Sequence, residues 1–150
     1  MCLISRSWFA RNRREILRDI DATFEMSEVP LISIVDDDEA ARDGMRVFIE
    51  SLGYKGVTFK SAEHFLQSDV IASTICVITD MQMPGIDGLA LQQALRLKGY
   101  HTPIILITAH PNEKYRTRAL DAGAVGFLTK PVDERSLIEC LTAAIRLRSS

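Results

Sequence analysis

Four places along the chain put a polar side chain directly at the end of a short apolar run. Three consecutive aspartates at 36–38 follow the first run, and Asp80 ends the third. Thr108 ends the fourth run, and Lys130 follows the fifth. If the runs are strands of one open parallel sheet, these side chains all lie on the rim formed by the carboxyl ends of the strands, where such sheets bind ligands.

Carboxylates gathered on one rim repel each other, by roughly 4 kcal/mol per pair at 4 Å and an effective dielectric near 20, so the site needs a cation. A small set of oxygen ligands favours Mg²⁺, which in proteins usually binds one or two carboxylates, water and a phosphate group. Beside such an ion Asp80 can act as a nucleophile, Lys130 can neutralise phosphoryl oxygens and Thr108 can donate its hydroxyl. The pattern therefore predicts phosphoryl transfer onto Asp80.

Each of these residues also has an ordinary structural interpretation. A run of aspartates after a strand is often a turn or a helix cap, and a lysine before a proline is often a surface residue. A threonine at a strand end is common as well. Agreement at four separate strand ends is what favours the chemical interpretation.

The elements that must position these side chains follow from the hydrophobic pattern. From Pro30 onward, short apolar runs alternate with longer segments of helical periodicity, which is typical of βα units and a parallel sheet. Most runs lack strict alternation, as expected for strands covered by helices on both faces. We predict five strands, at Leu31 to Val35, Gly56 to Phe59, Ile75 to Thr79, Ile104 to Thr108 and Val125 to Thr129.

Fold priors for such a chain favour an α/β, flavodoxin-like (βα)5 doubly wound parallel sheet with strand order 2-1-3-4-5. In this order strands one and three are neighbours, at the point where the strand order reverses. Asp36, Asp37 and Asp80 would then lie together, although they are far apart in the sequence.

Five helices are predicted between and after the strands. The first spans Glu39 to Leu52, with apolar residues along one face and Gly53 placed to end it. The fourth ends before Gly123, and the fifth continues to about Leu147. A capping side chain is expected to begin each of the later helices, at Ser61, Asp87, Asn112 and Asp133.

Length and composition fit one globular domain. The chain has 150 residues, of which 47% are hydrophobic and 25% charged. A formal net charge of −2 gives no general basic surface, so no direct DNA binding is expected. No run reaches the ~20 apolar residues that span a bilayer, and residues 1–10 do not resemble a signal peptide, which predicts a cytoplasmic protein outside the membrane. Cys2, Cys76 and Cys140 are far apart and lack zinc spacing, which predicts reduced thiols without a metal.

Residues 1–28 are predicted to form an extension, as a helix or without order, ahead of a domain at 29–150. The first 25 residues hold five arginines and four acidic residues and show no strand pattern. Three interpretations stay open for them: a helix that binds a partner or a second copy, a weak helix at a membrane surface, and a stretch upstream of a true start near Met26.

Four segments of this sequence resemble the receiver domain of two-component response regulators, and the likeness extends from Leu31 to about Leu147. They correspond to the acidic turn, the phospho-acceptor loop, the switch strand and the last signature of that family. The segments are Val35 to Glu39, Ile78 to Gly88, Ile107 to Ala109 and Gly123 to Pro131.

The resemblance implies that Asp80 is phosphorylated by a sensor histidine kinase or a histidine phosphotransfer protein, with Mg²⁺ as cofactor. Asp37 would bind the ion directly, Asp36 mainly through water, and Gln82 through its backbone carbonyl. Lys130 would bind the phosphoryl group, and its peptide bond to the following proline would be cis. Kinase recognition is expected on the first predicted helix, around Arg42 and Arg46.

Thr108 and Phe127 would be the switch residues, Thr108 moving toward the phosphoryl oxygens and Phe127 into the space behind it. The helix after Asn112, the fifth strand and the last helix would then present a changed face. Its partner would be an unknown downstream protein or, in a homodimer, a second copy of the chain. Gln82 and His110 occupy the positions that tune the lifetime of the acyl phosphate.

Within the family, the segments Ser61 to Leu66 and Met81 to Pro84 are most similar to receivers of nitrogen-fixation and nitrate-response regulators. Those regulators usually carry a DNA-binding domain as well. Because the present sequence ends at Ser150, we expect a stand-alone receiver.

Other classes with this fold or these residue types fit less well. Haloacid-dehalogenase-like phosphatases need a second aspartate two residues after the nucleophile, where this chain has Gln82. A flavodoxin needs a hydroxyl- and glycine-rich phosphate loop after the first strand, where this chain has aspartates. The open alternative is a receiver-fold binding module that is not phosphorylated. We expect a signalling protein and not an enzyme, with Mg²⁺-dependent self-phosphorylation and autodephosphorylation as its only chemistry.

Overall fold

The computed structural model describes residues 29–149. The chain divides into two units, Met1–Pro30 and Leu31–Ser150, and the description below concerns the second. The extension predicted for residues 1–28 lies outside the described residues, so its boundary with the domain stays a prediction.

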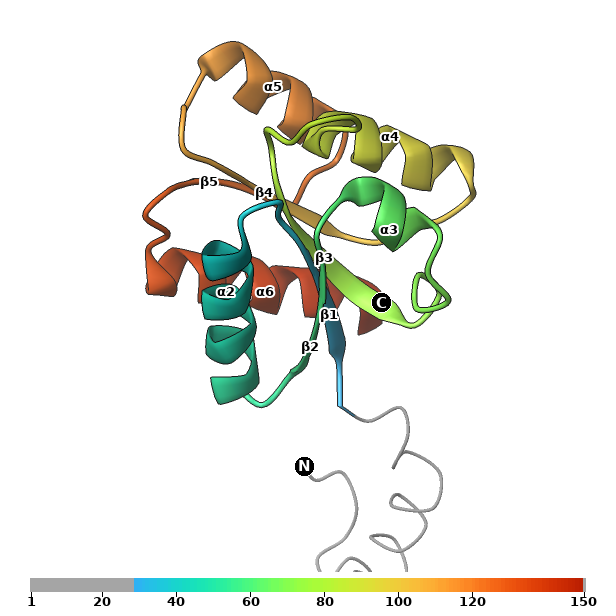
Figure 1. Cartoon of the computed structure of the whole chain (residues 1–150), viewed down its shortest axis with the longest axis vertical. Coiled ribbons are helices and arrows are strands. Elements are labelled where there is room, and N and C mark those ends of the chain that lie inside the picture. The colour runs from blue at the N-terminus through green and yellow to red at the C-terminus, as the bar shows by residue number, and fades with distance from the viewer. Residues whose placement is uncertain (1–28, 150) are drawn as a thin grey trace, which may run out of the picture. The chain divides into compact units, whose positions relative to one another are not determined.

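Five parallel strands form one sheet in the order β2-β1-β3-β4-β5 (Figure 1). This order confirms the predicted doubly wound fold, in which β1 and β3 are neighbours at the reversal of strand order. The strands are β1 (Leu31–Val35), β2 (Lys55–Phe59), β3 (Thr74–Asp80), β4 (Ile104–Thr108) and β5 (Gly126–Thr129).

Strand boundaries differ from the prediction by one residue at several ends. β3 begins at Thr74, a polar residue that the hydrophobic pattern left outside the strand. Thr74 is fully buried, but its hydroxyl lies 2.7 Å from Ser33 Oγ and donates to the carbonyl of Val70 at 2.7 Å. Because the hydroxyl is satisfied inside the core, the strand can include it.

Five helices connect and follow the strands. Ser61, Asp87 and Asn112 each accept a backbone N–H of the helix that follows, and Asp133 accepts the N–H of Ser136, so all four predicted caps are confirmed. The helices are α2 (Glu39–Ser51), α3 (Ala62–Leu66), α4 (Gly88–Leu97), α5 (Glu113–Asp121) and α6 (Glu134–Ser149).

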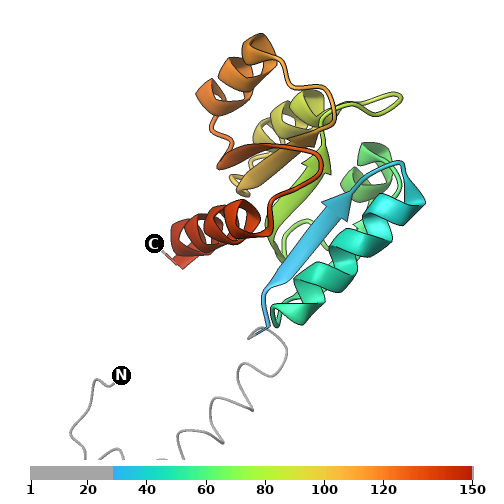
Figure 2. The same ribbon diagram turned by 90° about the vertical axis from the view of Figure 1, so that its left-hand side faces the viewer.

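The helices cover both faces of the sheet, α2 and α6 one face and α3, α4 and α5 the other (Figures 1 and 2). The first layer packs Ile49 of α2 and Leu141 of α6 against the strands, and the second packs Phe65 of α3 and Leu91 of α4. Burying each of these large side chains contributes about 1.5–3 kcal/mol. Two packed layers therefore hold the strand ends of the rim in place.

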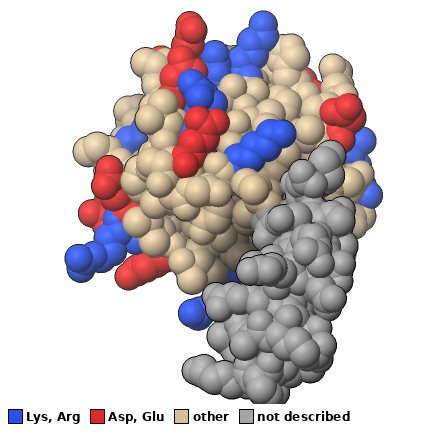
Figure 3. All heavy atoms as spheres, turned by 90° about the horizontal axis from the view of Figure 1, so that it is seen from below, with Lys and Arg blue, Asp and Glu red and all other residues tan. Residues whose placement is uncertain are grey.

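The surface gives no large single-sign area on the side drawn in Figure 3, where acidic and basic side chains are interspersed. Among residues 29–149, no helix has the length and apolar composition needed to cross a membrane.

Candidate functional site

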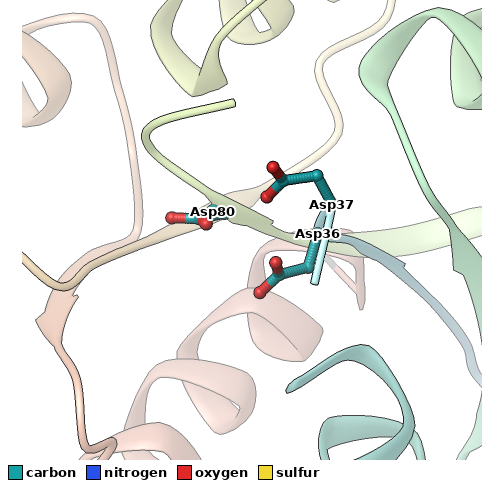
Figure 4. A group of neighbouring side chains, drawn as sticks. All are labelled: Asp36, Asp37 and Asp80. Atoms are coloured by element: carbon teal, nitrogen blue, oxygen red, sulfur yellow. The ribbon is translucent and has the colours of Figure 1, made fainter. Parts of the chain in front are cut away.

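Three carboxylates from two adjacent strands meet at one rim of the sheet. β1 and β3 pair in register up to Val35 and Thr79, so the residues that follow, Asp36 and Asp80, are neighbours. Asp36, Asp37 and Asp80 each offer a carboxylate oxygen, and these oxygens lie within 4.8 Å of one another. Figure 4 shows the three side chains at the adjoining ends of the strands, with their carboxylates toward the same side. The structure thus brings together the acids that the sequence placed far apart.

The three acids differ in exposure. Asp36 is buried, Asp80 is half-buried and Asp37 is exposed. Asp36 is fixed by its surroundings, since its Oδ1 accepts the N–H of Asp38 at 2.9 Å and its carbonyl accepts Arg42 Nη1 at 2.9 Å. Arg42, expected on a kinase-recognition surface, therefore also holds the turn that carries Asp36.

The third aspartate of the run, Asp38, has a different role. Its carboxylate accepts the N–H of Ala41 at 3.2 Å and caps the start of α2. A side chain that caps a helix satisfies an N–H that otherwise has no partner. The resemblance described above likewise assigns metal binding to Asp36 and Asp37 and not to Asp38.

Within residues 29–149, Lys130 is the basic side chain that forms ion pairs with the carboxylates of the acidic cluster. Its Nζ lies 3.2 Å from Asp36 Oδ2 and 3.5 Å from Asp80 Oδ2. Partial burial favours the neutral amine, but attraction to Asp36 and Asp80 outweighs it and raises the pKa of Lys130 above its usual 10.5. The lysine is therefore an ammonium ion at neutral pH. Its peptide bond to Pro131 is cis, as predicted.

The pKa of Asp80 is also shifted by its surroundings. Burial raises the pKa of its carboxyl above 3.8, repulsion by Asp36 raises it further, and Lys130 offsets only part of the effect. The cluster therefore holds more negative charge than its one lysine compensates. An additional cation bound among these oxygens would lower that repulsion.

The loop after Asp80 is anchored at both of its ends. Met81 and Met83 are buried, while Gln82 between them is exposed and its N–H donates to Asp80 Oδ1 at 3.4 Å. Gly88 closes the loop, since its N–H donates to the carbonyl of Met81 at 2.9 Å. A Cβ at position 88 would lie 2.5 Å from Leu106 Cδ2 and 2.9 Å from the backbone carbonyl oxygen of Asp80, so glycine suits this close approach.

The predicted switch residues lie on β4, which pairs with β3, and on β5, which pairs with β4. Thr108 is 1% exposed at the end of β4, and its Oγ1 accepts the N–H of His110 at 3.0 Å. Phe127 is buried in β5, in the core layer under α3, α4 and α5. The N–H of Lys130 donates to the carbonyl of Thr108 at 2.8 Å, which joins the lysine to the switch strand. His110 itself is exposed.

This arrangement can bind a divalent cation through oxygen ligands and place a carboxylate and an ammonium group next to it. Mg²⁺ prefers this donor set, and a deficit of positive charge around Asp80 fits a site that receives one. Asp36, Asp37 and Asp80 are the side chains that could hold the ion. The backbone carbonyl of Gln82 lies on the loop that directly follows Asp80.

Comparison with known proteins gives a consistent result. A family model described as the response regulator receiver domain matches residues 32–142. The transcriptional regulatory protein TdiR of Thauera aromatica is 34% identical over 116 residues, which are 77% of this chain and 51% of that protein. Nodulation protein W of Bradyrhizobium diazoefficiens is 36% identical over 120 residues, which are 80% of this chain and 53% of that protein. The chain thus spans about half the length of these relatives.

Solved structures agree with the sequence matches. The response regulator StyR aligns with a TM-score of 0.73 and 35% identity, covering 81% of this chain and 61% of that one. The FixJ-N crystal structure aligns with a TM-score of 0.69 and 30% identity, covering 77% of this chain and 92% of that one.

Proposed function

The chain belongs to the family of response regulator receiver domains, a signalling family, and from this premise we propose that Asp80 accepts a phosphoryl group from a phosphohistidine donor in the presence of Mg²⁺. The observation that carries the proposal is the convergence of Asp36, Asp37 and Asp80 next to Lys130. One ammonium group does not fully compensate the repulsion among three carboxylates, and a bound cation would reduce that repulsion.

Each residue has a proposed part in the transfer. A carboxylate oxygen of Asp80 attacks the phosphorus, the phosphorus–nitrogen bond of the donor breaks, and the imidazole of the donor keeps the electron pair. Lys130, which already touches Asp80, pairs with a phosphoryl oxygen. When bound, Mg²⁺ supplies further positive charge for the carboxylates and the phosphoryl oxygens.

The proposed ligands of Mg²⁺ are Asp37 directly, Asp36 mainly through water, Asp80, and the carbonyl of Gln82. Hydrolysis returns the domain to its resting state: water attacks the phosphorus, the bond between phosphorus and the carboxylate oxygen of Asp80 breaks, and inorganic phosphate leaves. Gln82 and His110 are both exposed, so their side chains can meet that water and set the lifetime of the acyl phosphate. We propose no reaction on an external substrate, and in this sense the domain is not an enzyme.

Output is proposed to pass through the face of α5, β5 and α6. Thr108 would move toward the phosphoryl oxygens, and Phe127 would follow it. The phosphoryl group would favour this conformation because it interacts with Thr108 only there, and such differential binding is what shifts an equilibrium between two conformations. A downstream protein or a second copy of the chain would bind the changed face.

The partners are proposed from the family. A receiver domain implies a histidine kinase or a phosphotransfer protein as donor, and we propose that the reaction takes place in the cytoplasm. FixJ of Azorhizobium caulinodans, 34% identical over 120 residues, is named a transcriptional regulatory protein, and this chain matches 57% of it. For the domain described here we propose protein contacts without direct DNA binding.

The proposal is tested by incubating the protein with Mg²⁺ and a small acyl phosphate and measuring its intact mass. The wild type should gain one phosphoryl group and Asp80→Asn should gain none. Asp69→Asn, a change at an exposed aspartate outside the cluster, is the matched control and should be labelled like the wild type. An unlabelled wild type would favour the alternative, a binding module that keeps the fold without phosphorylation.

A further inference from the structure

A side chain of α3 holds the loop that follows Asp80. Glu63 Oε2 accepts the backbone N–H of Ile86 at 3.3 Å, across 23 positions of sequence. Ile86 lies near the end of the loop between β3 and α4, four residues after Gln82. The contact therefore ties the outer part of this loop to a different element of the fold.

The backbone at Glu63 is held in place by its neighbours in α3. α3 is short, but Ser61 caps its start and its residues Ala62 and Phe65 are both fully buried. Glu63 stands between these two anchors, and its side chain is partly buried. Little conformational entropy is then lost when the carboxylate binds the loop, because its backbone is already ordered.

The loop in turn is shaped to receive this carboxylate. Gly85 has a φ of +79°, a conformation that side chains with a Cβ rarely adopt. A Cβ at position 85 would lie 2.6 Å from Glu63 Oε2, so the carboxylate fills the space over this glycine. A larger residue at 85 would displace the carboxylate from the N–H of Ile86.

We infer that Glu63 is a positioning residue for the metal site: it holds the loop in the shape that presents the carbonyl of Gln82 to Mg²⁺. The inference rests on the proposed function, since Gln82 is a ligand only if Mg²⁺ binds at the acidic cluster. Outer groups that orient a ligand typically change metal affinity by about 10- to 100-fold when removed. Glu63 acts through the hydrogen bond to Ile86 and makes no contact with the ion.

Three variants separate the hydrogen bond from the charge. Glu63→Ala removes both. Glu63→Asp keeps the charge but shortens the side chain by one methylene, so its carboxylate no longer reaches the loop. Glu63→Gln keeps the reach and an oxygen acceptor but loses the charge. Glu113→Ala, at an exposed glutamate of α5, is the matched control for loss of one acidic residue.

The first measurement is hydrogen exchange of the Ile86 amide in the metal-free protein. We expect it to quicken in Glu63→Ala and Glu63→Asp, and to stay near the wild-type rate in Glu63→Gln. This readout does not depend on metal binding or phosphorylation.

The second measurement is the dissociation constant for Mg²⁺ by calorimetric titration. We expect it to rise about tenfold in Glu63→Ala and Glu63→Asp, and to change by less than about threefold in Glu63→Gln and Glu113→Ala. Faster exchange at Ile86 with unchanged Mg²⁺ affinity would overturn the inference and leave Glu63 a purely structural contact. Wild-type protein that binds no Mg²⁺ would instead overturn the proposed function, and the inference with it.

Discussion

The ammonium group of Lys130 lies 3.5 Å from Asp80 Oδ2, although the two residues are 50 positions apart in the chain. The same group lies 3.2 Å from Asp36 Oδ2. In the metal-free protein, Lys130 thus provides part of the positive charge that the acidic cluster requires. A divalent ion bound by the same oxygens would compete with it.

Replacing this lysine should affect metal binding and phosphorylation in opposite directions. Lys130→Met leaves a more negative cluster, so Mg²⁺ should bind more tightly, by about 1 kcal/mol or roughly fivefold. Phosphorylation by a small acyl phosphate should slow by at least about tenfold, because a group that stabilises the phosphoryl oxygens is lost. Calorimetry and intact-mass kinetics measure the two effects. Lys114→Met, at an exposed lysine of α5, should change neither.

Replacement by alanine should lower the stability of the protein at Gly88 and raise it at Gly44. A Cβ at position 88 would lie 2.9 Å from the carbonyl oxygen of Asp80 as well as against Leu106. Gly88→Ala should therefore lower the free energy of unfolding by about 1–3 kcal/mol and slow phosphorylation. Gly44 lies inside α2 with nothing within 4 Å of its would-be Cβ, so Gly44→Ala should raise stability by about 0.5–1 kcal/mol. Urea unfolding measures both, and equal effects would contradict the proposed close packing at 88.

Gln92 should contribute to stability through α5. Its buried side-chain Nε2 donates from α4 to the carbonyls of Ala119 and Ala122, at 3.4 and 3.3 Å. Gln92→Ala removes both hydrogen bonds and should lower the free energy of unfolding by about 1–2 kcal/mol. Gln93→Ala changes the exposed neighbour and should have an effect below about 0.5 kcal/mol. Comparable losses in the two variants would show that these hydrogen bonds do not matter.

The raised pKa of Asp80 predicts how stability depends on pH in the metal-free protein. Folding favours the protonated carboxyl, so ionised Asp80 lowers the stability of the native state. This loss is absent below the unfolded pKa of 3.8 and is complete once the pH has risen through the folded pKa. Asp80→Asn should therefore be more stable than the wild type at pH 7 in EDTA, with the difference shrinking toward pH 4. A constant difference over this range would be inconsistent with the shift.

Much of the fold could be predicted because the determining signals are local. Ser61, Asp87, Asn112 and Asp133 were recognisable as caps, since a capping side chain acts within three residues of itself. The convergence at the rim followed from strand ends and strand order together.

Several contacts that the sequence did not predict join residues distant in the chain. No periodic pattern in the sequence indicates the pairing of Lys130 with Asp36 or the hydrogen bond that the N–H of Ile86 donates to Glu63. In the sequence, nothing distinguishes Gln92 from an exposed polar residue of a helix. Its burial depends on how α5 packs over α4. Such contacts depend on side-chain geometry after the elements have packed.

The most direct test is to locate the phosphoryl group by borohydride reduction, which converts an aspartyl phosphate to homoserine. The protein is incubated with an acyl phosphate, reduced, digested and sequenced by mass spectrometry. We expect homoserine at position 80 with Mg²⁺, and unmodified aspartate there when EDTA is present or when Asp37 is changed to Asn. Homoserine at another position, or equal modification of Asp80 without a divalent ion, would contradict a metal-assisted acceptor at this rim.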